Sequence, residues 1–318
     1  MTVLGTLALA VPAMIAVAVI VLVVASAWLA RRAEATVPPD GRFIDLPDAR
    51  LHYIDMGSGP PIVLVHGLGG HSRNFTYALA GRLAAHHRLL IIDRPGSGYS
   101  TWKGTPDWRI GSNARVVSQF IAALDLDRPL LVGHSLGGAI GLAVALDYPR
   151  AIAGLALLAP LTLPVDQVSD LHKPLVIRSA LLRRLIAQTV AVPIARMQGT
   201  AALAAVFAPE PAPADFNSNG GGALTARPSA FIAITSELVN AGDDMPGIAA
   251  RYAQLSLPVG ILYGREDKIL DAAHQGTDAA GLIAGCELEL MTGGHMIPVT
   301  APDHVAGWIR RQAQRAGV

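Results

Sequence analysis

The sequence predicts an α/β fold in which a mostly parallel sheet is flanked by helices and preceded by one apolar helix. Two observations lead to this prediction. Beyond residue 60, short apolar runs bounded by Gly, Pro or Asp alternate with helical stretches. Such runs are typical of strands buried on both faces of a parallel sheet. Before them, residues 2–30 contain no charged side chain, which indicates a segment that meets lipid.

Composition narrows the class of protein. A chain of 318 residues can bury a sizeable core. Its 52% hydrophobic and 15% charged residues, with a mean hydropathy of +0.41, are too apolar for an ordinary soluble protein. A net charge of +1 gives no electrostatic basis for binding nucleic acid. The single cysteine, Cys286, excludes an internal disulfide, and no Cys/His cluster has metal-ligand spacing, so we expect neither metal nor cofactor.

The N-terminal residues 1–32 are predicted to form a transmembrane anchor. At about 1.5 Å per residue, the stretch from Val11 to Ala30 spans the roughly 30 Å hydrocarbon core of a bilayer. A cleaved signal peptide is the alternative, because Ala25-Ser26-Ala27 resembles a cleavage site. The apolar run is long for a signal peptide, however, and no basic side chain precedes it.

The residues after this segment suggest its orientation. Arg31 and Arg32 follow the apolar run directly, so the positive-inside rule predicts that the rest of the chain faces the cytoplasm. Residues 33–42 contain Pro38-Pro39 and are expected to form a short stiff linker.

The α/β core is predicted over residues 43–160 and 255–318. After Pro160 the alternation of strands and helices stops, and it resumes at Val259. We therefore expect residues 161–254 to be a mostly helical insertion that forms a cap. The predicted strands are 51–54, 62–65, 89–92, 130–132, 155–158, 259–263 and 286–291, and the predicted crossover helices between them are 108–124 and 137–146.

A nucleophile is suggested by Gly133-His134-Ser135-Leu136-Gly137, which has the G-x-S-x-G form and follows a predicted strand. A serine aimed out of a tight strand-to-helix turn has a strained backbone. The flanking glycines let strand and helix pass closely. Ser135 is therefore the candidate nucleophile.

A serine hydroxyl needs a base and an orienting carboxylate. Asp267 follows the strand 259–263, and His295 lies in a glycine-rich loop after the strand 286–291. We therefore predict a Ser135–His295–Asp267 triad, with Glu266 as the alternative to Asp267. Most of the other histidines are expected to have no catalytic role, and His172 lies in the predicted insertion.

The negative charge that develops on a substrate carbonyl needs preorganised donors. Leu136 offers a backbone N–H at the start of a helix. The loop His66-Gly67-Leu68-Gly69-Gly70 follows a buried strand and offers a second, from Leu68. These two amides are the predicted oxyanion hole.

Together these segments resemble the motif set of the α/β-hydrolase fold superfamily. The motifs, in order, are His66–Gly70, Asp93–Ser100, Gly133–Gly138, Tyr263–Asp267 and Gly294-His295. The sequence is similar to the branch that includes epoxide hydrolases, haloalkane dehalogenases, haloperoxidases and carbon–carbon bond hydrolases. Epoxide hydrolases and dehalogenases use an aspartate where this chain has Ser135. The resemblance therefore implies an esterase-like serine hydrolase.

The expected substrate is a small or medium hydrophobic carboxylic ester, because apolar residues dominate the predicted cap and an anchor would hold the site near lipids. A serine-type carbon–carbon bond hydrolase of aromatic degradation is one alternative. A catalytically idle scaffold that binds a hydrophobic ligand is another. The sequence does not identify a protein partner.

Overall fold

The computed structural model describes residues 3–165 and 169–318. The N-terminal half contains α1 (Val3–Thr36), β1 (Arg42–Asp45), β2 (Ala49–Met56), β3 (Pro61–Val65), α2 (Arg73–Thr76), α3 (Ala80–Leu83), β4 (Arg88–Ile92), β5 (Thr101–Trp102), α4 (Ile110–Ala123), β6 (Leu130–His134), α5 (Leu136–Asp147) and β7 (Gly154–Leu158). The remainder contains η1 (Lys173–Leu175), α6 (Ala180–Ile186), η2 (Ala187–Ala191), α7 (Val192–Phe207), η3 (Gly222–Thr225), α8 (Pro228–Ala249), η4 (Tyr252–Gln254), β8 (Val259–Gly264), η5 (Ala273–Asp278), α9 (Ala279–Leu282), β9 (Glu287–Met291), α10 (Ile297–Thr300) and α11 (Pro302–Ala316).

One sheet organises the body of the protein. Its strand order is β1-β2-β4-β3-β6-β7-β8-β9, with β5 paired to β2. The strands β1, β2 and β4 pair antiparallel, and all pairs from β4–β3 to β8–β9 are parallel. The parallel pairs share one direction, so the loops after β3, β4, β6, β8 and β9 meet at the carboxyl edge of the sheet, where ligands bind in such folds. The predicted α/β fold class is confirmed.

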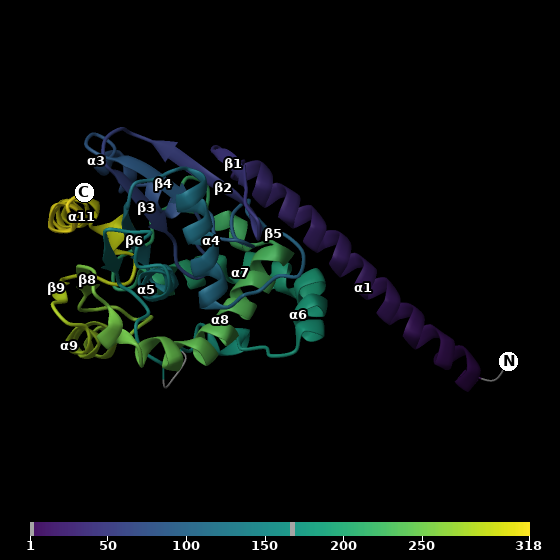
Figure 1. Ribbon diagram of the computed structural model, residues 1–318. Helices are drawn as coiled ribbons and strands as arrows, with labels where there is room; N and C mark the ends of the chain where they lie inside the picture. The colour runs from purple at the N-terminus through teal and green to yellow at the C-terminus, as the bar shows by residue number, and fades with distance from the viewer. Residues whose placement is uncertain (1–2, 166–168) are drawn as a thin grey trace.

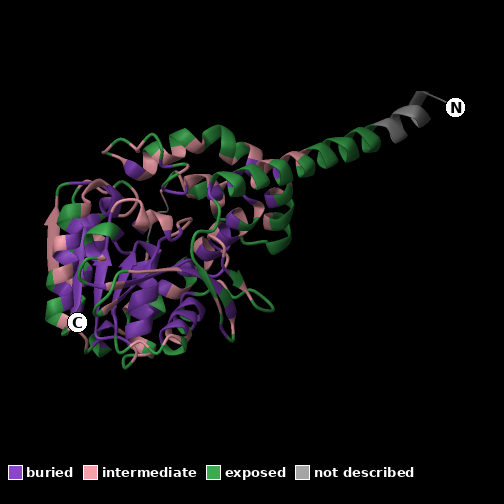
Figure 2. Ribbon diagram, turned by 90° about the horizontal axis from the view of Figure 1, so that it is seen from above, coloured by how far each residue is buried: buried purple, intermediate pink, exposed green. Residues whose placement is uncertain are grey.

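The apolar runs form the central strands because both faces of the sheet are covered. Strands β6 and β7 are buried at every residue. Helix α4 packs against α5, and α3 packs against α11, so two helix pairs lie beside the sheet (Figure 1). Helix α5 is buried from Leu136 to Ala145, and Figure 2 shows the sheet within the buried interior of the body. The core therefore holds the carboxyl edge rigidly.

The described part of the stretch between β7 and β8 contains α6, η2, α7 and α8. Helix α8 contacts both α4 and α5 of the core. We call the stretch from residue 161 to residue 254 the cap.

Helix α1 differs from its predicted extent. It continues to Thr36, into the expected linker 33–42, and β1 begins at Arg42. The helix stays ordered because Ala33 and Val37 are buried, and it ends where Pro38 removes a backbone donor and disfavours a helical residue before it. Its first half projects from the body (Figures 1 and 2). By length and composition α1 could cross a membrane, a test that an N-terminal signal sequence also passes.

Candidate active site

Ser135 lies at the turn between β6 and α5. Its φ of 54° and ψ of −121° fall outside the regions that residues with a Cβ ordinarily occupy. The strain is held by hydrogen bonds, because its N–H donates to Leu158 O at 3.0 Å and its carbonyl accepts from Gly138 N at 2.8 Å. A strained serine at the end of a central strand has the geometry expected of a nucleophile, which keeps Ser135 as the candidate.

Two glycines make room for this turn. A Cβ on Gly137 would lie 2.2 Å from the carbonyl oxygen of Val65, so α5 could not start this close to β3. A Cβ on Gly67 would lie 2.7 Å from the Cβ of Ser135. The loop after β3 therefore reaches Ser135 only because position 67 has no side chain.

His295 and Asp267 meet at the same edge of the sheet. The Nδ1–H of His295 donates to Oδ2 of Asp267 at 2.7 Å, and both side chains are buried. The other oxygen of Asp267 accepts from the N–H groups of Ile269 and Leu270 at 2.8 and 3.0 Å. The carboxylate is thus fixed and orients the imidazole through Nδ1, so that Nε2 is the nitrogen that could accept a proton.

Glu266, the alternative to Asp267, has a different hydrogen-bond partner. Glu266 does not approach His295 as a triad acid; it accepts a hydrogen bond from Gly293 N at 2.6 Å. A second carboxylate, Glu210 of the cap, accepts from Gly294 N at 3.1 Å. Two carboxylates therefore hold the loop that carries His295, and the sequence analysis had not assigned a role to Glu210.

His134, next to the nucleophile, also supports this loop. It donates from Nε2 to the carbonyl of His295 at 3.0 Å. Burial, followed by the charge of His295, lowers the pKa of His134 to about 3. His134 is therefore neutral at ordinary pH and acts as a fixed donor.

The two residues of the predicted oxyanion hole lie at the same cavity as Ser135. Leu68 and Leu136 both line the cavity that contains Ser135. Leu136 is the first residue of α5, and the N–H groups of the first helical turn have no partner within the helix. Leu136 is thus placed to donate to a developing oxyanion, and Leu68 lies in the loop that Gly67 brings close.

The loop after β3 is braced by Arg94, at the end of β4. The Arg94 guanidinium donates to the carbonyls of His66 and Gly67 at 3.1 and 3.0 Å. It is paired with Glu237 of cap helix α8, with an Nη2–Oε2 distance of 3.0 Å and a second, shorter contact between Nη1 and Oε1. A cap carboxylate therefore fixes the arginine that fixes the oxyanion loop.

A cavity of about 160 Å³ opens onto Ser135 and His295. Most of its lining is aliphatic and comes from both core and cap: Leu68, Leu136, Leu161, Val165, Val206, Leu238, Ala241, Gly242, Met245, Ile269 and Leu270. Cap residues Ser169 and His172 add polar groups. Such a cavity suits an uncharged, mostly apolar substrate.

His172, which the sequence placed in the insertion without a catalytic role, lies at the candidate site. It lines the cavity, and its Nδ1 lies 2.8 Å from the hydroxyl of Ser169. Burial, followed by the charge of His295, lowers the pKa of His172, so its imidazole is neutral at ordinary pH. No local sequence pattern marks this residue, because only the fold of the cap brings it to the site.

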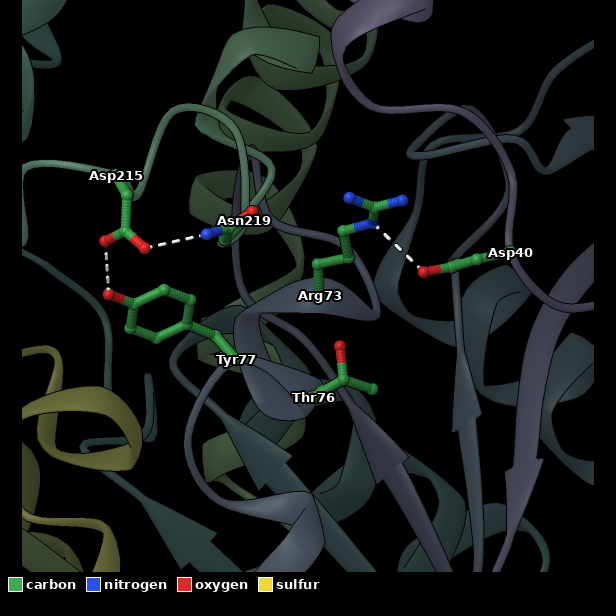
Figure 3. Close-up of a pocket in the computed structure, with 6 residues that line it drawn as sticks. All are labelled: Asp40, Arg73, Thr76, Tyr77, Asp215 and Asn219. Atoms are coloured by element: carbon green, nitrogen blue, oxygen red, sulfur yellow. Dashed lines mark hydrogen bonds and ion pairs between the residues drawn. The ribbon is translucent and has the colours of Figure 1, made fainter.

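A larger hollow of about 510 Å³ lies on the surface between the loop 213–222 and α2, and Figure 3 shows its polar lining. The polar side chains that line it form hydrogen bonds and an ion pair with one another. The Tyr77 hydroxyl donates to Asp215 at 2.6 Å, Asn219 donates to Asp215 at 2.8 Å, and Arg73 pairs with Asp40 at 3.2 Å. We therefore interpret this hollow as a structural contact between cap and core.

Among the described residues, no group of three or more His, Cys, Asp or Glu side chains is placed to hold a metal ion. Cys286 is a free, partly buried thiol, and burial raises its pKa to about 11.

Comparison with known proteins finds curated relatives that match part of the chain. A curated relative, haloalkane dehalogenase 2 of Mycobacterium bovis, is 36% identical over 123 residues, which are 38% of this chain and 42% of the relative. The 2-hydroxy-6-oxo-6-phenylhexa-2,4-dienoate hydrolase of Comamonas testosteroni is 33% identical over 119 residues, 36% of this chain and 42% of the relative. The chain thus spans under half the length of these relatives.

Solved structures extend the likeness over the whole fold. A bacterial membrane phospholipase A aligns with a TM-score of 0.70 over 98% of both chains, at 21% identity, which shows a shared fold. The family model described as the alpha/beta hydrolase fold matches residues 60–302. That match covers most of the sheet, the cap and all the site residues, and this chain belongs to the α/β-hydrolase fold family.

Proposed function

We propose that this protein is a serine hydrolase that cleaves hydrophobic carboxylic esters through an acyl-enzyme on Ser135. The observation that carries the proposal is the 2.7 Å hydrogen bond between His295 Nδ1 and Asp267 Oδ2, with His295 and the strained Ser135 lining one apolar cavity. Nucleophile, base and orienting acid come from three different loops and converge on one edge of the sheet.

In this mechanism the Ser135 hydroxyl attacks the ester carbonyl while His295 Nε2 takes its proton. The carbonyl oxygen becomes an oxyanion that accepts hydrogen bonds from the N–H groups of Leu68 and Leu136. Collapse of the tetrahedral intermediate breaks the ester C–O bond, and His295 returns the proton to the leaving alkoxide. Water, deprotonated by His295, then releases the carboxylic acid and restores Ser135.

Asp267 serves this cycle by position and charge. It fixes the imidazole tautomer and stabilises the imidazolium that forms after proton transfer. The hydrogen bonds from Ile269 and Leu270 hold its second oxygen, so the carboxylate cannot turn away from His295. Glu210 and Glu266 hold the His295 loop through the adjacent glycine amides.

Labelling with a fluorophosphonate probe tests the proposal. The parent should be labelled at Ser135 and should hydrolyse nitrophenyl esters, and Ser135→Ala should lose both properties. Ser169→Ala is the matched control, because Ser169 lines the same cavity and should leave labelling intact. Ester turnover by Ser135→Ala close to that of the parent would end the proposal.

A carbon–carbon bond hydrolase is the second candidate. The Comamonas testosteroni relative carries that activity in its name, and the neutral His172 offers a polar contact that a simple alkyl ester does not need. Turnover of a ring-cleavage diketone without turnover of nitrophenyl esters would favour this candidate.

We also propose that α1 is retained as a single-pass membrane anchor with the body on the cytoplasmic side. The segment that resembles a cleavage site packs on the cap, where the buried Ser26 donates its hydroxyl proton to the carbonyl of Thr189 at 2.7 Å. Cleavage after Ala27 would remove this contact. Protease protection in sealed vesicles tests the orientation.

A further inference from the structure

The cap exposes more apolar surface than its packing explains. Five large apolar side chains on α6 and α7 are exposed, up to 84% for Met197, and we call them the apolar cap surface: Leu181, Leu182, Leu185, Ile194 and Met197. The stretch Ala180–Phe207 is apolar enough to qualify as a membrane span, yet only 17% of its most apolar window is buried. Helices this apolar in a soluble core are mostly buried. We therefore expect this surface to be covered by a partner.

The position of the surface points to that partner. Helix α1 packs against η2 and α7, and Figure 1 shows α6 and α7 on the side of the body where α1 leaves it. Residues 11–21 of α1 are exposed throughout, and contact with the body begins at Leu22. The projecting stretch from Val3 to residue 21 is about 28 Å long at 1.5 Å per residue, close to the roughly 30 Å hydrocarbon core. The bilayer would thus end where the cap begins.

The charges of this region fit a lipid headgroup layer. From Lys173 to Pro209 the chain contains no Asp or Glu, while Arg184 and Arg196 are exposed between the apolar side chains. At the base of the projecting helix, the Arg32 guanidinium lies 4.7 Å from the ring centroid of Trp28. Tryptophan and arginine at the edge of an apolar segment are typical of the membrane interface.

We propose that the apolar cap surface inserts into the interfacial layer of the bilayer beside α1, and that the active site takes its ester from that layer. The proposal rests on the proposed anchoring and ester hydrolysis, and it names the substrate class as esters of membrane lipids. Helix α7 connects the apolar cap surface with the active-site cavity. Val206 near its end lines the cavity, and Met197 is exposed on the surface.

Depth-dependent fluorescence quenching in the full chain tests the insertion. An environment-sensitive dye is placed on Met197→Cys, and on Leu282→Cys as the matched control, both in a Cys286→Ala background. Leu282 is 54% exposed and apolar but lies on α9. In vesicles of equimolar phosphatidylcholine and phosphatidylglycerol, lipids with brominated acyl chains should quench the dye at position 197 and leave the dye at position 282 unquenched.

Equal exposure of both dyes to water would overturn the proposal. So would disulfide cross-linking between two copies through position 197 without lipid quenching, because that result makes the surface a contact between copies of this chain.

Activity on two substrates tests the supply of substrate. Leu181→Asp combined with Leu185→Asp should lower hydrolysis of vesicle phospholipid by about tenfold or more, since two apolar side chains leave the lipid. Hydrolysis of a water-soluble nitrophenyl ester should change little. Leu282→Asp, the matched control, should change neither rate.

An equal loss on both substrates, or no loss on the vesicle substrate, would overturn the lipid route. Failure of the parent to hydrolyse any ester would instead reject the proposed function, and the quenching result would still decide whether the surface inserts.

Discussion

The buried pair between Arg94 and Glu237 offers the sharpest test of how the cap supports the site. Their side chains are 1% and 2% exposed. Glu237→Leu would leave the Arg94 guanidinium charged and buried without its partner. Removing one member of a buried pair costs about 3–5 kcal/mol in the free energy of unfolding. At roughly 2 °C per kcal/mol for a domain of this size, the Tm should fall by about 6–10 °C.

The chain supplies its own control on the same helix. Arg178 and Asp243 form a pair at 3.2 Å, with side chains 71% and 45% exposed. Asp243→Asn should cost at most about 1 kcal/mol, because water screens an exposed pair. Calorimetry of the two variants therefore compares the loss of stability from breaking a buried ion pair with the loss from breaking an exposed one.

Turnover gives a second readout, since Arg94 also holds the carbonyls of His66 and Gly67. Displacement of the loop should lower kcat toward soluble esters by up to about 10²–10³-fold, the effect of losing one oxyanion donor. A double variant, Arg94→Met with Glu237→Leu, should regain stability without regaining kcat. A Glu237→Leu protein with unchanged Tm and kcat would refute the reasoning.

Four further outcomes are expected. Asp267→Asn should lower kcat by about 10⁴-fold with little change in Tm, as steady-state kinetics would show, and a loss under tenfold would contradict the triad. His172→Leu should keep labelling of Ser135 and increase kcat/KM for longer alkyl esters relative to short ones, and an unchanged ratio would remove His172 from the substrate's path. Burial of Asp93 opposes its ionisation, but the hydrogen bond from His52 and the neighbouring histidine charges lower its pKa below the ordinary 3.8. The ionised carboxylate therefore stabilises the fold fully above pH 3.8, and this stabilisation is lost as the pH falls toward the folded pKa. In Asp93→Asn, the free energy of unfolding measured by denaturant titration should therefore depend less on pH in the acid range. Removal of residues 1–21 should leave turnover of a water-soluble ester nearly unchanged, and a large loss in that assay would show that the projecting helix supports the fold.

The fold was predictable because its signals are local. Each central strand is a short apolar run with turn residues at its ends, and strands β6 and β8 lie where those runs predict them. The placement of Ser135, Asp267 and His295 after three such strands follows from the parallel sheet, which brings strand ends to one edge. Spacing in the sequence was therefore enough to predict that these three residues lie at one edge of the sheet.

The supporting residues could not be predicted because they act across long separations. Glu237 meets Arg94 over 143 positions, and Glu210 meets Gly294 over 84. Neither carboxylate stands in a motif, and each looks like an ordinary surface charge until the cap is placed on the core. His172 is similar, since its position in the cavity depends on the path of the segment between β7 and α6.

The two cap carboxylates bear on how this enzyme could be altered. Glu210 and Glu237 belong to the cap, yet each supports a loop of the core. Glu210 binds the loop that carries His295, and Glu237 supports the loop that carries Leu68 through Arg94. The cap is therefore not an exchangeable module that only sets the shape of the pocket. In a chimera with a cap that lacks acids at these two places, we expect Ser135, Asp267 and His295 to remain but the loops that carry His295 and Leu68 to lose their alignment.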